Sequence, residues 1–302
     1  MDLRDIEYFA VIAEYGHLGR AAEALGMGQP ALSISLRRLE NSANAKLVKR
    51  TPKGVELTDI GRVLLSHVER LKLARRDLAR EISDLAHAQA GHLRVGASPA
   101  TAHGYLADAC ASLLKDAAKV TIDVSVAAST RGLLHALQKG ELDIIVPHML
   151  SAPPEGVVRE PLWEDEFVVY ASVHHRLAKM KSVALADLVH ERWAATMTSA
   201  VLARQSLEQT FQEHGLPMPQ IALTSDSAVT NRRLVASAGL LGVDSRRLLE
   251  RDAGHLGLKI IPVRDLKWIR PVYAAYRGDG YLSPLARRLI EILKDRARTP
   301  KT

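Results

Sequence analysis

Apolar residues in the first part of the chain recur at helical spacing and predict three helices joined by short turns. The first helix covers about residues 3–13 and the second about residues 19–25, where alanines allow a neighbouring helix to approach closely. Gly26 and Gly28 supply the backbone freedom that a tight turn requires. A third helix begins at Gln29-Pro30, because proline fits the first turn of a helix. Two short helices joined by a tight turn predict a helix-turn-helix.

The third predicted helix separates apolar from polar side chains. Its leucines form one side, which leaves Gln29, Ser33 and Arg37 on or near the opposite side. Glutamine can read adenine through two hydrogen bonds, serine can bond several base edges, and arginine can reach guanine or phosphate. The pattern favours a helix that reads DNA. A plain pair of antiparallel helices with a solvated basic face remains the alternative.

A predicted β-hairpin follows the third helix. Two short β-patterned runs, at residues 47–50 and 54–57, are joined by Thr51-Pro52-Lys53-Gly54. Arg50 and Lys53 fall near the tip of this hairpin. A basic hairpin after a helix-turn-helix is a wing, which suits contact with phosphates or the minor groove.

The run AAEALGMGQPALSISLRRLE, followed by LVKRTPKGVELTDIGR, resembles the N-terminal domain of LysR-type transcriptional regulators, and the similarity extends over most of the chain. The resemblance implies a winged helix-turn-helix domain at residues 1–58 that binds double-stranded DNA. It places Gln29, Pro30 and Ser33 against the duplex with the wing beside them. The complete set of predicted DNA-binding residues is Arg20, Gln29, Pro30, Ser33, Arg37, Arg38, Arg50 and Lys53.

Two positions depart from the family pattern. Gly28 stands where the family often has serine, and Ile34 stands where it often has a basic residue. Ile34 removes one expected contact with a base or the DNA backbone, for which Arg37 or Arg38 is expected to compensate.

Residues 59–90 predict one long helix. Thr58 is placed to cap it, and apolar residues then alternate in steps of four and three, interrupted only by Arg75. This pattern is typical of a coiled-coil seam, so the helix is expected to pair with a second copy of the chain. Packing against its own domain is the alternative. The predicted seam residues are Leu64, Val68, Leu71, Leu78, Ile82 and Leu85.

Dimerisation would place two winged domains on one particle, which predicts an operator with dyad symmetry. The family resemblance implies the same dimer, often assembled further into a homotetramer. It also implies ligand-linked control of DNA binding.

Strands and helices alternate from residue 91 to the end, which predicts an α/β domain with a parallel sheet. The chain is expected to cross twice between two lobes, near Trp163 and Lys267. Lobe I would comprise residues 91–162 and 269–302, and lobe II residues 163–268. This arrangement resembles the effector-binding domain of LysR-type regulators, which is similar to periplasmic solute-binding proteins.

Hydroxyl side chains recur where predicted strands run into helices, and such positions bind anions in α/β folds. The alternative at each position is that the hydroxyl only caps the following helix and binds no ligand. We expect a small organic anion as effector, for example an aromatic carboxylate or sulfonate. The predicted effector-binding residues are Ser98, Ala100, Thr101, Ser129, Thr130, His148, Thr196, Met197, Thr198, Ser199 and Ser225.

Composition adds limits to this prediction. The chain carries a net charge of +7, and residues 20–62 hold eight Lys/Arg against four Asp/Glu. Cys110 is the single cysteine, which excludes an intramolecular disulfide and disfavours a cysteine metal site. The charged N-terminus and the lack of a long apolar run predict a cytoplasmic protein without membrane contact.

Other functions find little support in the sequence. No nucleotide-binding loop, metal-binding motif or nucleophile motif occurs, so neither an enzyme nor a cofactor other than the effector is expected. A solute-binding or scaffold protein without DNA binding is the remaining alternative, and it leaves the wing and the seam unexplained.

Overall fold

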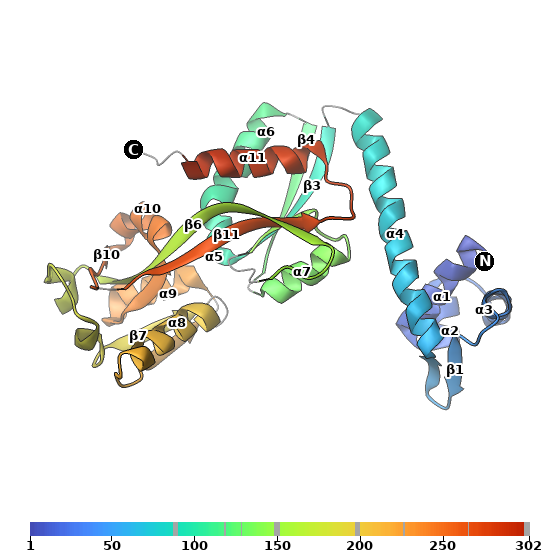
Figure 1. Ribbon diagram of the computed structural model, residues 1–302, viewed down its shortest axis with the longest axis horizontal. Helices are drawn as coiled ribbons and strands as arrows, with labels where there is room; N and C mark the ends of the chain where they lie inside the picture. Colours follow the sequence, from blue (N-terminus) through green and yellow to red (C-terminus); the bar gives the residue numbers. More distant parts are fainter. Residues whose placement is uncertain are drawn as a thin grey trace. The chain divides into compact units, whose positions relative to one another are not determined.

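The computed structural model describes residues 1–86, 90–117, 119–127, 129–147, 152–196, 200–225, 227–264 and 266–298. The chain divides into two compact units, residues 1–79 and 80–302 (Figure 1). Among the described helices, none combines the length and apolar character that a membrane span requires.

The first unit is a three-helix domain with a hairpin, followed by a long helix. Its elements are α1 (Leu3–Tyr15), α2 (Leu18–Ala24), α3 (Gln29–Ala43), β1 (Val48–Thr51), β2 (Gly54–Leu57) and α4 (Asp59–Ala86), of which residues up to 79 belong to this unit. Ala21 and Ala22 of α2 are buried, as their small size predicted. The three helices, the wing and the start of α4 enclose one apolar core.

The start of α4 is fixed to the domain by hydrogen bonds. The Thr58 hydroxyl accepts a bond from Gly61 N and donates one to Lys46 O (2.7 Å), which confirms Thr58 as the cap. A Cβ atom on Gly61 would lie 2.1 Å from Leu47 O, so only glycine permits this close approach.

The second unit is an α/β domain with two lobes. Lobe I contains β3 (Ala90–Ala97), α5 (Pro99–Thr101), the π-helical turn η1 (Ala102–Leu106), α6 (Ala107–Asp116), β4 (Lys119–Val126), α7 (Thr130–Gln138), β5 (Ile144–Val146) and α11 (Pro284–Arg298). Lobe II contains η2 (Arg176–Lys179), η3 (Leu185–Leu188), β7 (Arg192–Thr196), α8 (Ala200–Glu213), β8 (Gln220–Ser225), α9 (Ala228–Ala238), β9 (Gly242–Ser245), α10 (Arg246–Leu256) and β10 (Leu258–Ile260).

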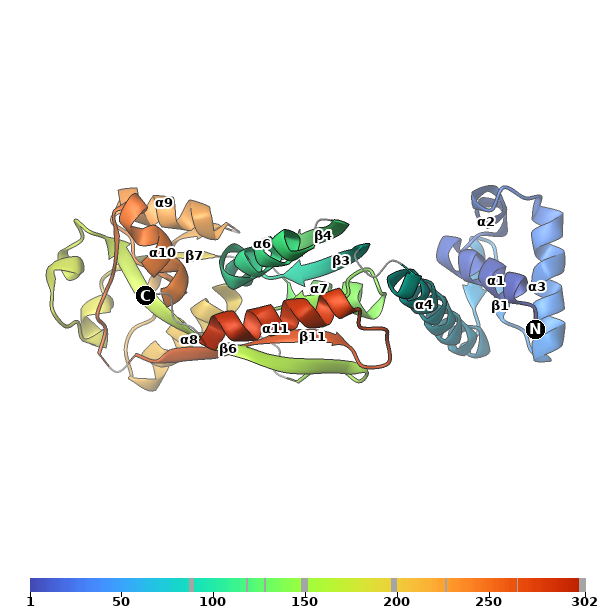
Figure 2. The same ribbon diagram turned by 90° about the horizontal axis from the view of Figure 1, so that it is seen from above.

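Two long strands, β6 (Val157–Ser172) and β11 (Trp268–Arg277), run through both lobes side by side (Figures 1 and 2). Trp163, where the first crossing was expected, lies in β6, and Lys267, where the second was expected, directly precedes β11. The two strands pair antiparallel, and the large sheet has the order β10-β6-β11-β5-β3-β4 with β9 also on β6. The predicted parallel sheet is therefore only partly correct. Among the described strands, β3 pairs in parallel with β4 and with β5, and β7 pairs in parallel with β8, whereas β6, β9, β10 and β11 pair antiparallel.

Side chains alternate between the two faces of the sheet and build a core on each side. In lobe I, Ile144 and Val146 pack in the core with α6 and α11, whereas Ile145 packs with α7. Figure 1 shows these helices beside the sheet. In lobe II, Val169 of β6 faces α8, and its neighbour Val168 faces α9 and α10.

Candidate DNA interface and effector site

The turn between α2 and α3 presents the start of α3 to solvent. Gly26 adopts a φ of 63°, a conformation that favours glycine. Gly28 caps α3 without a side-chain hydrogen bond, so the first N–H groups of α3 receive no side-chain partner there. Such N–H groups, at the positive end of a helix dipole, can bind a phosphate.

The outer side of α3 carries the predicted base-reading residues. Gln29, Pro30 and Arg37 are exposed and Ser33 is half-buried, while Leu32, Leu36 and Leu39 lie in the core. Ile34 belongs to the same outer side, with 62% of its surface exposed. The predicted separation of faces is confirmed.

Four predicted DNA-binding cations are available at the surface. Arg20, Arg37, Arg50 and Lys53 are exposed, and none has an acidic partner within the described residues. Because no internal ion pair has to be broken, these side chains can bind phosphates directly.

Arg38 differs from these four. Its guanidinium forms a two-pronged ion pair with Asp5 of α1, which also accepts a hydrogen bond from Ser35 (2.6 Å). Asp5 is buried, and the hydrogen bonds from Arg38 and Ser35 lower its pKa against the opposing effect of burial. Arg38 therefore joins α3 to α1, whereas Arg37 has no such partner within the described residues. That either arginine compensates for Ile34 stays a prediction, and the structure favours Arg37.

The wing is held against the turn between α1 and α2. Arg50 pairs with Val55 and Thr51 with Gly54, which confirms the predicted hairpin. Val55 N donates to Gly16 O (2.8 Å), and Gly54 has a φ of 135°. A side chain at Gly54 would meet Gly16 O at 2.2 Å, so glycine is required here.

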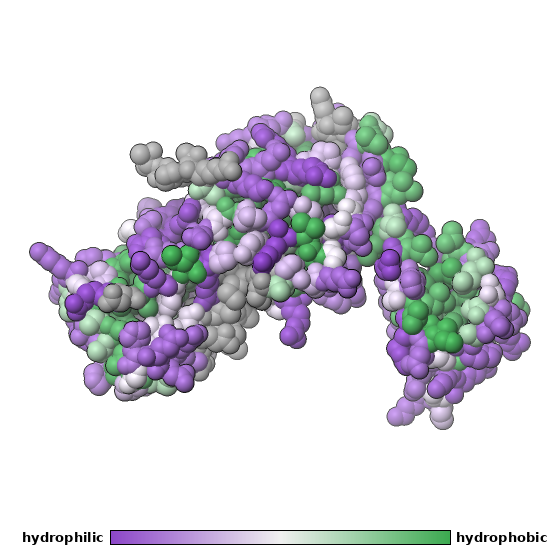
Figure 3. Space-filling view, in the orientation of Figure 1, coloured by the Kyte–Doolittle hydropathy of each residue, from purple (hydrophilic) through white to green (hydrophobic). Residues whose placement is uncertain are grey.

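The predicted seam on α4 starts later than the sequence indicated. Val68 is 1% exposed and Leu64 is half-buried, and both pack into the core of the winged domain. The prediction that Val68 is a seam residue is wrong, because the first turns of α4 complete their own domain. For half-buried Leu64 it stays a prediction. Leu71, Leu78, Ile82 and Leu85 are between 50% and 78% exposed, and apolar surface follows the exposed side of α4 (Figure 3).

In lobe I, the strand-end hydroxyls gather at one edge of the sheet, because β3, β4 and β5 are parallel. The Ser98 hydroxyl caps α5, and Thr101 Oγ1 donates to Val146 O at the end of β5 (2.6 Å). Both hydroxyls are buried and bonded inside the chain, as ordinary caps are. Ser129 caps α7, and Thr130 opens that helix.

In lobe II, the ends of the parallel strands β7 and β8 place Thr196 beside Ser225. Ser225 Oγ accepts from Ser227 N (3.1 Å), and Ser227 caps α9. His148, Met197, Thr198 and Ser199 lie outside the described residues, and so does the side chain of Thr196.

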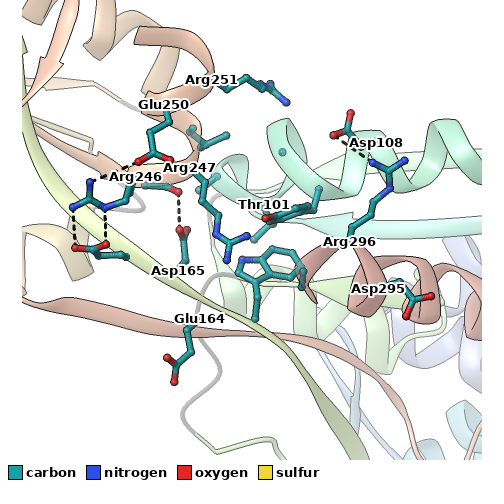
Figure 4. A pocket seen from close by; sticks show the side chains of 18 residues that line it. Thr101, Asp108, Glu164, Asp165, Arg246, Arg247, Glu250, Arg251, Asp295 and Arg296 are labelled. Carbon is teal, nitrogen blue, oxygen red and sulfur yellow. Dashed lines mark hydrogen bonds and ion pairs between the residues drawn. The ribbon is translucent and has the colours of Figure 1, made fainter. Parts of the chain in front are cut away.

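A pocket of about 910 Å³ lies next to the strand-end hydroxyls and is lined by Thr101 (Figure 4). Its walls come from α5 and η1, from β6, from α10 and from α11. Only Ala100 and Thr101 of the predicted effector residues line it. Tyr105, Trp163 and Arg247 also line the pocket and were not among the predicted effector residues, because no sequence motif marks them.

Asp165 on the pocket wall has a perturbed carboxyl group. It is 5% exposed and accepts a hydrogen bond from Ser245 Oγ (2.7 Å). Burial raises its pKa to about 6, assisted by the neighbouring charge of Asp244.

Comparison with known proteins identifies both units. A family model described as "Bacterial regulatory helix-turn-helix protein, lysR family" matches residues 3–62, and "LysR substrate binding domain" matches residues 86–298. The SDS degradation transcriptional activation protein of Pseudomonas sp. (strain ATCC 19151) is 31% identical, over 99% of this chain and 98% of that protein.

Solved structures agree in fold. A full-length OxyR variant from Pseudomonas aeruginosa is 25% identical, with a TM-score of 0.65 over 99% of this chain and 95% of that one. Full-length CbnR complexed with its target DNA is 17% identical, with a TM-score of 0.63 over 98% of this chain and 99% of that one. The chain belongs to the LysR family of DNA-binding transcriptional regulators.

Proposed function

We propose that this regulator binds a dyad-symmetric operator as a homo-oligomer and changes its DNA binding in response to a small organic anion. The observation that carries the DNA-binding part is the exposed side of α3 together with the wing, where four cations have no acidic partner within the described residues. Regulation by an effector rests on the second unit, which matches the substrate-binding domain of the family.

Base reading is assigned to Gln29, Ser33 and Ile34 on the outer side of α3. The first two can form hydrogen bonds with base edges, and an exposed branched apolar side chain can contact the methyl group of thymine. Arg50 and Lys53 on the wing are assigned to the DNA backbone, where they add affinity for any sequence.

Pairing of α4 helices from two chains would cover Leu71, Leu78, Ile82 and Leu85. Nothing in the described part of the chain covers these residues, whose spacing is that of a heptad seam. Two winged domains held together in this way bind two half-sites with a gain from effective concentration.

The effector is assigned to the strand-end edge of the second unit, between Ser98, Ser129 and Ser225. Helix α7 follows the end of strand β4 and helix α9 follows the end of strand β8. The N-terminal N–H groups of both helices favour binding of an anion. The relative from Pseudomonas is named for the degradation of SDS, an alkyl sulfate, which supports sulfates and sulfonates beside carboxylates.

Thiol-based sensing is the second candidate, because another relative is the hydrogen peroxide-inducible genes activator of Haemophilus influenzae, 25% identical over 99% of this chain and 98% of that protein. The single cysteine, Cys110, argues against it. Its thiol is buried, and burial raises its pKa to about 11, so the reactive thiolate is scarce at neutral pH.

DNase footprinting of the upstream region of its own gene tests the proposed function. We expect the full-length protein to protect two half-sites related by a dyad, with a protection pattern that changes when the right anion is added. Calorimetric titration with carboxylates, sulfates and sulfonates then identifies the effector class. Failure to protect any fragment would contradict the DNA-binding part, and binding of sugars or amines in place of anions would contradict the effector part.

A further inference from the structure

His17 is the residue directly before α2, and its ring is exposed at the surface of the winged domain. A Cβ atom on Gly54, in the wing, would lie 3.6 Å from His17 Cδ2. A Cβ atom on Gly19 would lie 3.2 Å from His17 Cε1 and 3.6 Å from Oε1 of Gln29, the first residue of α3. The ring therefore lies between the wing and the start of α3.

The hydrogen bond that the His17 ring accepts indicates which ring nitrogen carries the hydrogen. Nδ1 accepts a hydrogen bond from Gly19 N (3.1 Å), so it carries no hydrogen in this geometry. In the neutral ring the hydrogen is then on Nε2, which is a hydrogen-bond donor. Nε2 is bonded to both Cδ2 and Cε1, so this donor is placed between the wing and the start of α3.

The Nε2–H group of His17 is available to a ligand. Within the described residues, His17 forms no other hydrogen bond or ion pair, and the side chain of Gln29 forms none at all. Because the ring is exposed, water is the partner of Nε2 in the free protein. A ligand oxygen can replace this water without breaking a bond inside the chain.

The charge around His17 favours an anionic ligand. Arg20 follows it in the first turn of α2, and Lys53 precedes Gly54 in the wing; both cations are exposed and have no acidic partner within the described residues. No Asp or Glu occurs at residues 16–22 or 50–55. A phosphate oxygen is both an anion and a strong hydrogen-bond acceptor, so it suits this surface.

We propose that His17 binds a phosphate of the DNA backbone through Nε2–H, at the point where the duplex passes from the wing to α3. This inference rests on the proposed operator binding and adds a residue to the DNA interface that the sequence did not indicate. The contact lies beside Gln29, so it fixes the position of this side chain relative to the base edges. His17 thus serves both as the cap of α2 and as a backbone contact.

Two substitutions separate these two roles. Asparagine is a strong N-cap residue but has no donor at the position of Nε2, whereas alanine removes the cap as well. We expect His17→Asn to keep the melting temperature of the wild type and to bind DNA about tenfold more weakly, because a hydrogen bond to a charged group is lost. His17→Ala should bind as weakly as His17→Asn and also melt at a lower temperature.

Two further variants complete the set. His17→Ser repeats the comparison with a second capping side chain and should behave as His17→Asn does. His174→Asn changes an exposed histidine of the second unit. It is the matched control and should bind DNA as the wild type does.

Fluorescence anisotropy at pH 8 measures the binding of the full-length variants to two labelled duplexes. One duplex comes from the upstream region of the protein's own gene, and the other has the same length and a mixed sequence. Because a phosphate contact does not depend on sequence, His17→Asn should lose the same factor on both. A neutral ring releases no counterion, so the slope of log K against log salt concentration should stay unchanged, whereas Lys53→Ala should lower it by about 1.

Methylphosphonate substitution identifies the phosphate. Each phosphate of one half-site is replaced in turn by an uncharged methylphosphonate, and binding of the wild type and of His17→Asn is compared. We expect one position at which the replacement weakens the wild type by about tenfold and His17→Asn by much less. Such non-additivity is the signature of a direct contact between the two groups.

Three results would overturn the contact. Wild-type affinity of His17→Asn would show that the ring only caps α2, and a loss confined to the upstream duplex would indicate a base contact. The third is equal weakening of wild type and His17→Asn at every methylphosphonate position. Each of these results leaves the proposed function intact. Failure of the wild type to bind either duplex would instead contradict the proposed function itself.

Discussion

Replacement of Val68 by alanine separates the two roles that the apolar side of α4 plays. Val68 is 1% exposed and packs into the core of the winged domain, whereas Leu78, further along the same helix, is 57% exposed. We therefore expect Val68→Ala to weaken the fold of the first unit, and Leu78→Ala to weaken association between chains.

The magnitude follows from the buried carbon atoms that are lost. Val68→Ala removes two buried carbons, worth about 0.8 kcal/mol each, and the remaining cavity brings the cost to about 2 kcal/mol. Amides of α1 and α3 that exchange through opening of the domain should then exchange about 30-fold faster, since ~1.4 kcal/mol corresponds to a factor of ten. Hydrogen–deuterium exchange followed by mass spectrometry measures this change on the full-length protein.

Sedimentation equilibrium supplies the second measurement. Leu78→Ala should raise the dimer dissociation constant and leave the exchange of α1 and α3 unchanged, because an exposed side chain contributes little to the fold of its own chain. The reasoning would be refuted if Val68→Ala dissociated the dimer while exchange in α1 and α3 stayed at the wild-type rate.

Other predictions concern DNA reading and two buried carboxylates. Arg50→Ala should weaken binding to all DNA sequences and lower the slope of log K against log salt concentration by about 1, which fluorescence anisotropy titrations at several salt concentrations measure. Gln29→Ala and Ile34→Ala should instead relax the sequence preference at single positions of the operator, which selection of bound sequences measures. The pKa of Asp165 is about 6 in the folded state and about 4 in the unfolded state. The free energy of unfolding should therefore fall by about 3 kcal/mol as pH rises from about 4 to above 6. Urea unfolding should show this loss, and Asp165→Asn should remove it. The pKa of Asp143 is shifted in the opposite direction, because burial raises it but hydrogen bonds from two arginines outweigh the effect of burial and lower it. The stability that Asp143 contributes is therefore lost as pH falls below about 4. Asp143→Ala should lower the melting temperature strongly at neutral pH, because both arginines lose a buried partner.

Local patterns in the sequence were sufficient to predict most helices and strands. The turn at Gly26 and Gly28, the cap at Thr58 and the wing at residues 47–57 all depend on neighbours in the chain, and the structure confirms them. The first part of β6, from Val157 onward, was not recognised as a strand from the sequence. Pro161 and several charged residues hid it, and a bulge at Leu162 accommodates the proline in the ladder.

Residue contacts across long sequence separations could not be predicted in this way. A heptad pattern records that Val68 is apolar but not which surface covers it, and the pairing of Arg38 with Asp5 depends on how α1 and α3 meet. Likewise, Tyr105, Trp163 and Arg247 come from three separate elements that only the fold brings together.

The short strand β5 (Ile144–Val146) lies between the proposed effector edge and the last turns of α4. At its C-terminal end, Val146 O accepts a hydrogen bond from Thr101, beside the strand-end edge that is proposed to bind the effector. At its N-terminal end, Asp143 binds Arg80 of α4 (2.7 Å) and Arg94 of β3 (2.7 Å). All three residues of β5 are fully buried, so the strand cannot bend independently of its neighbours. We therefore expect a displacement at the proposed effector edge to reach the Arg80–Asp143 ion pair through these three residues.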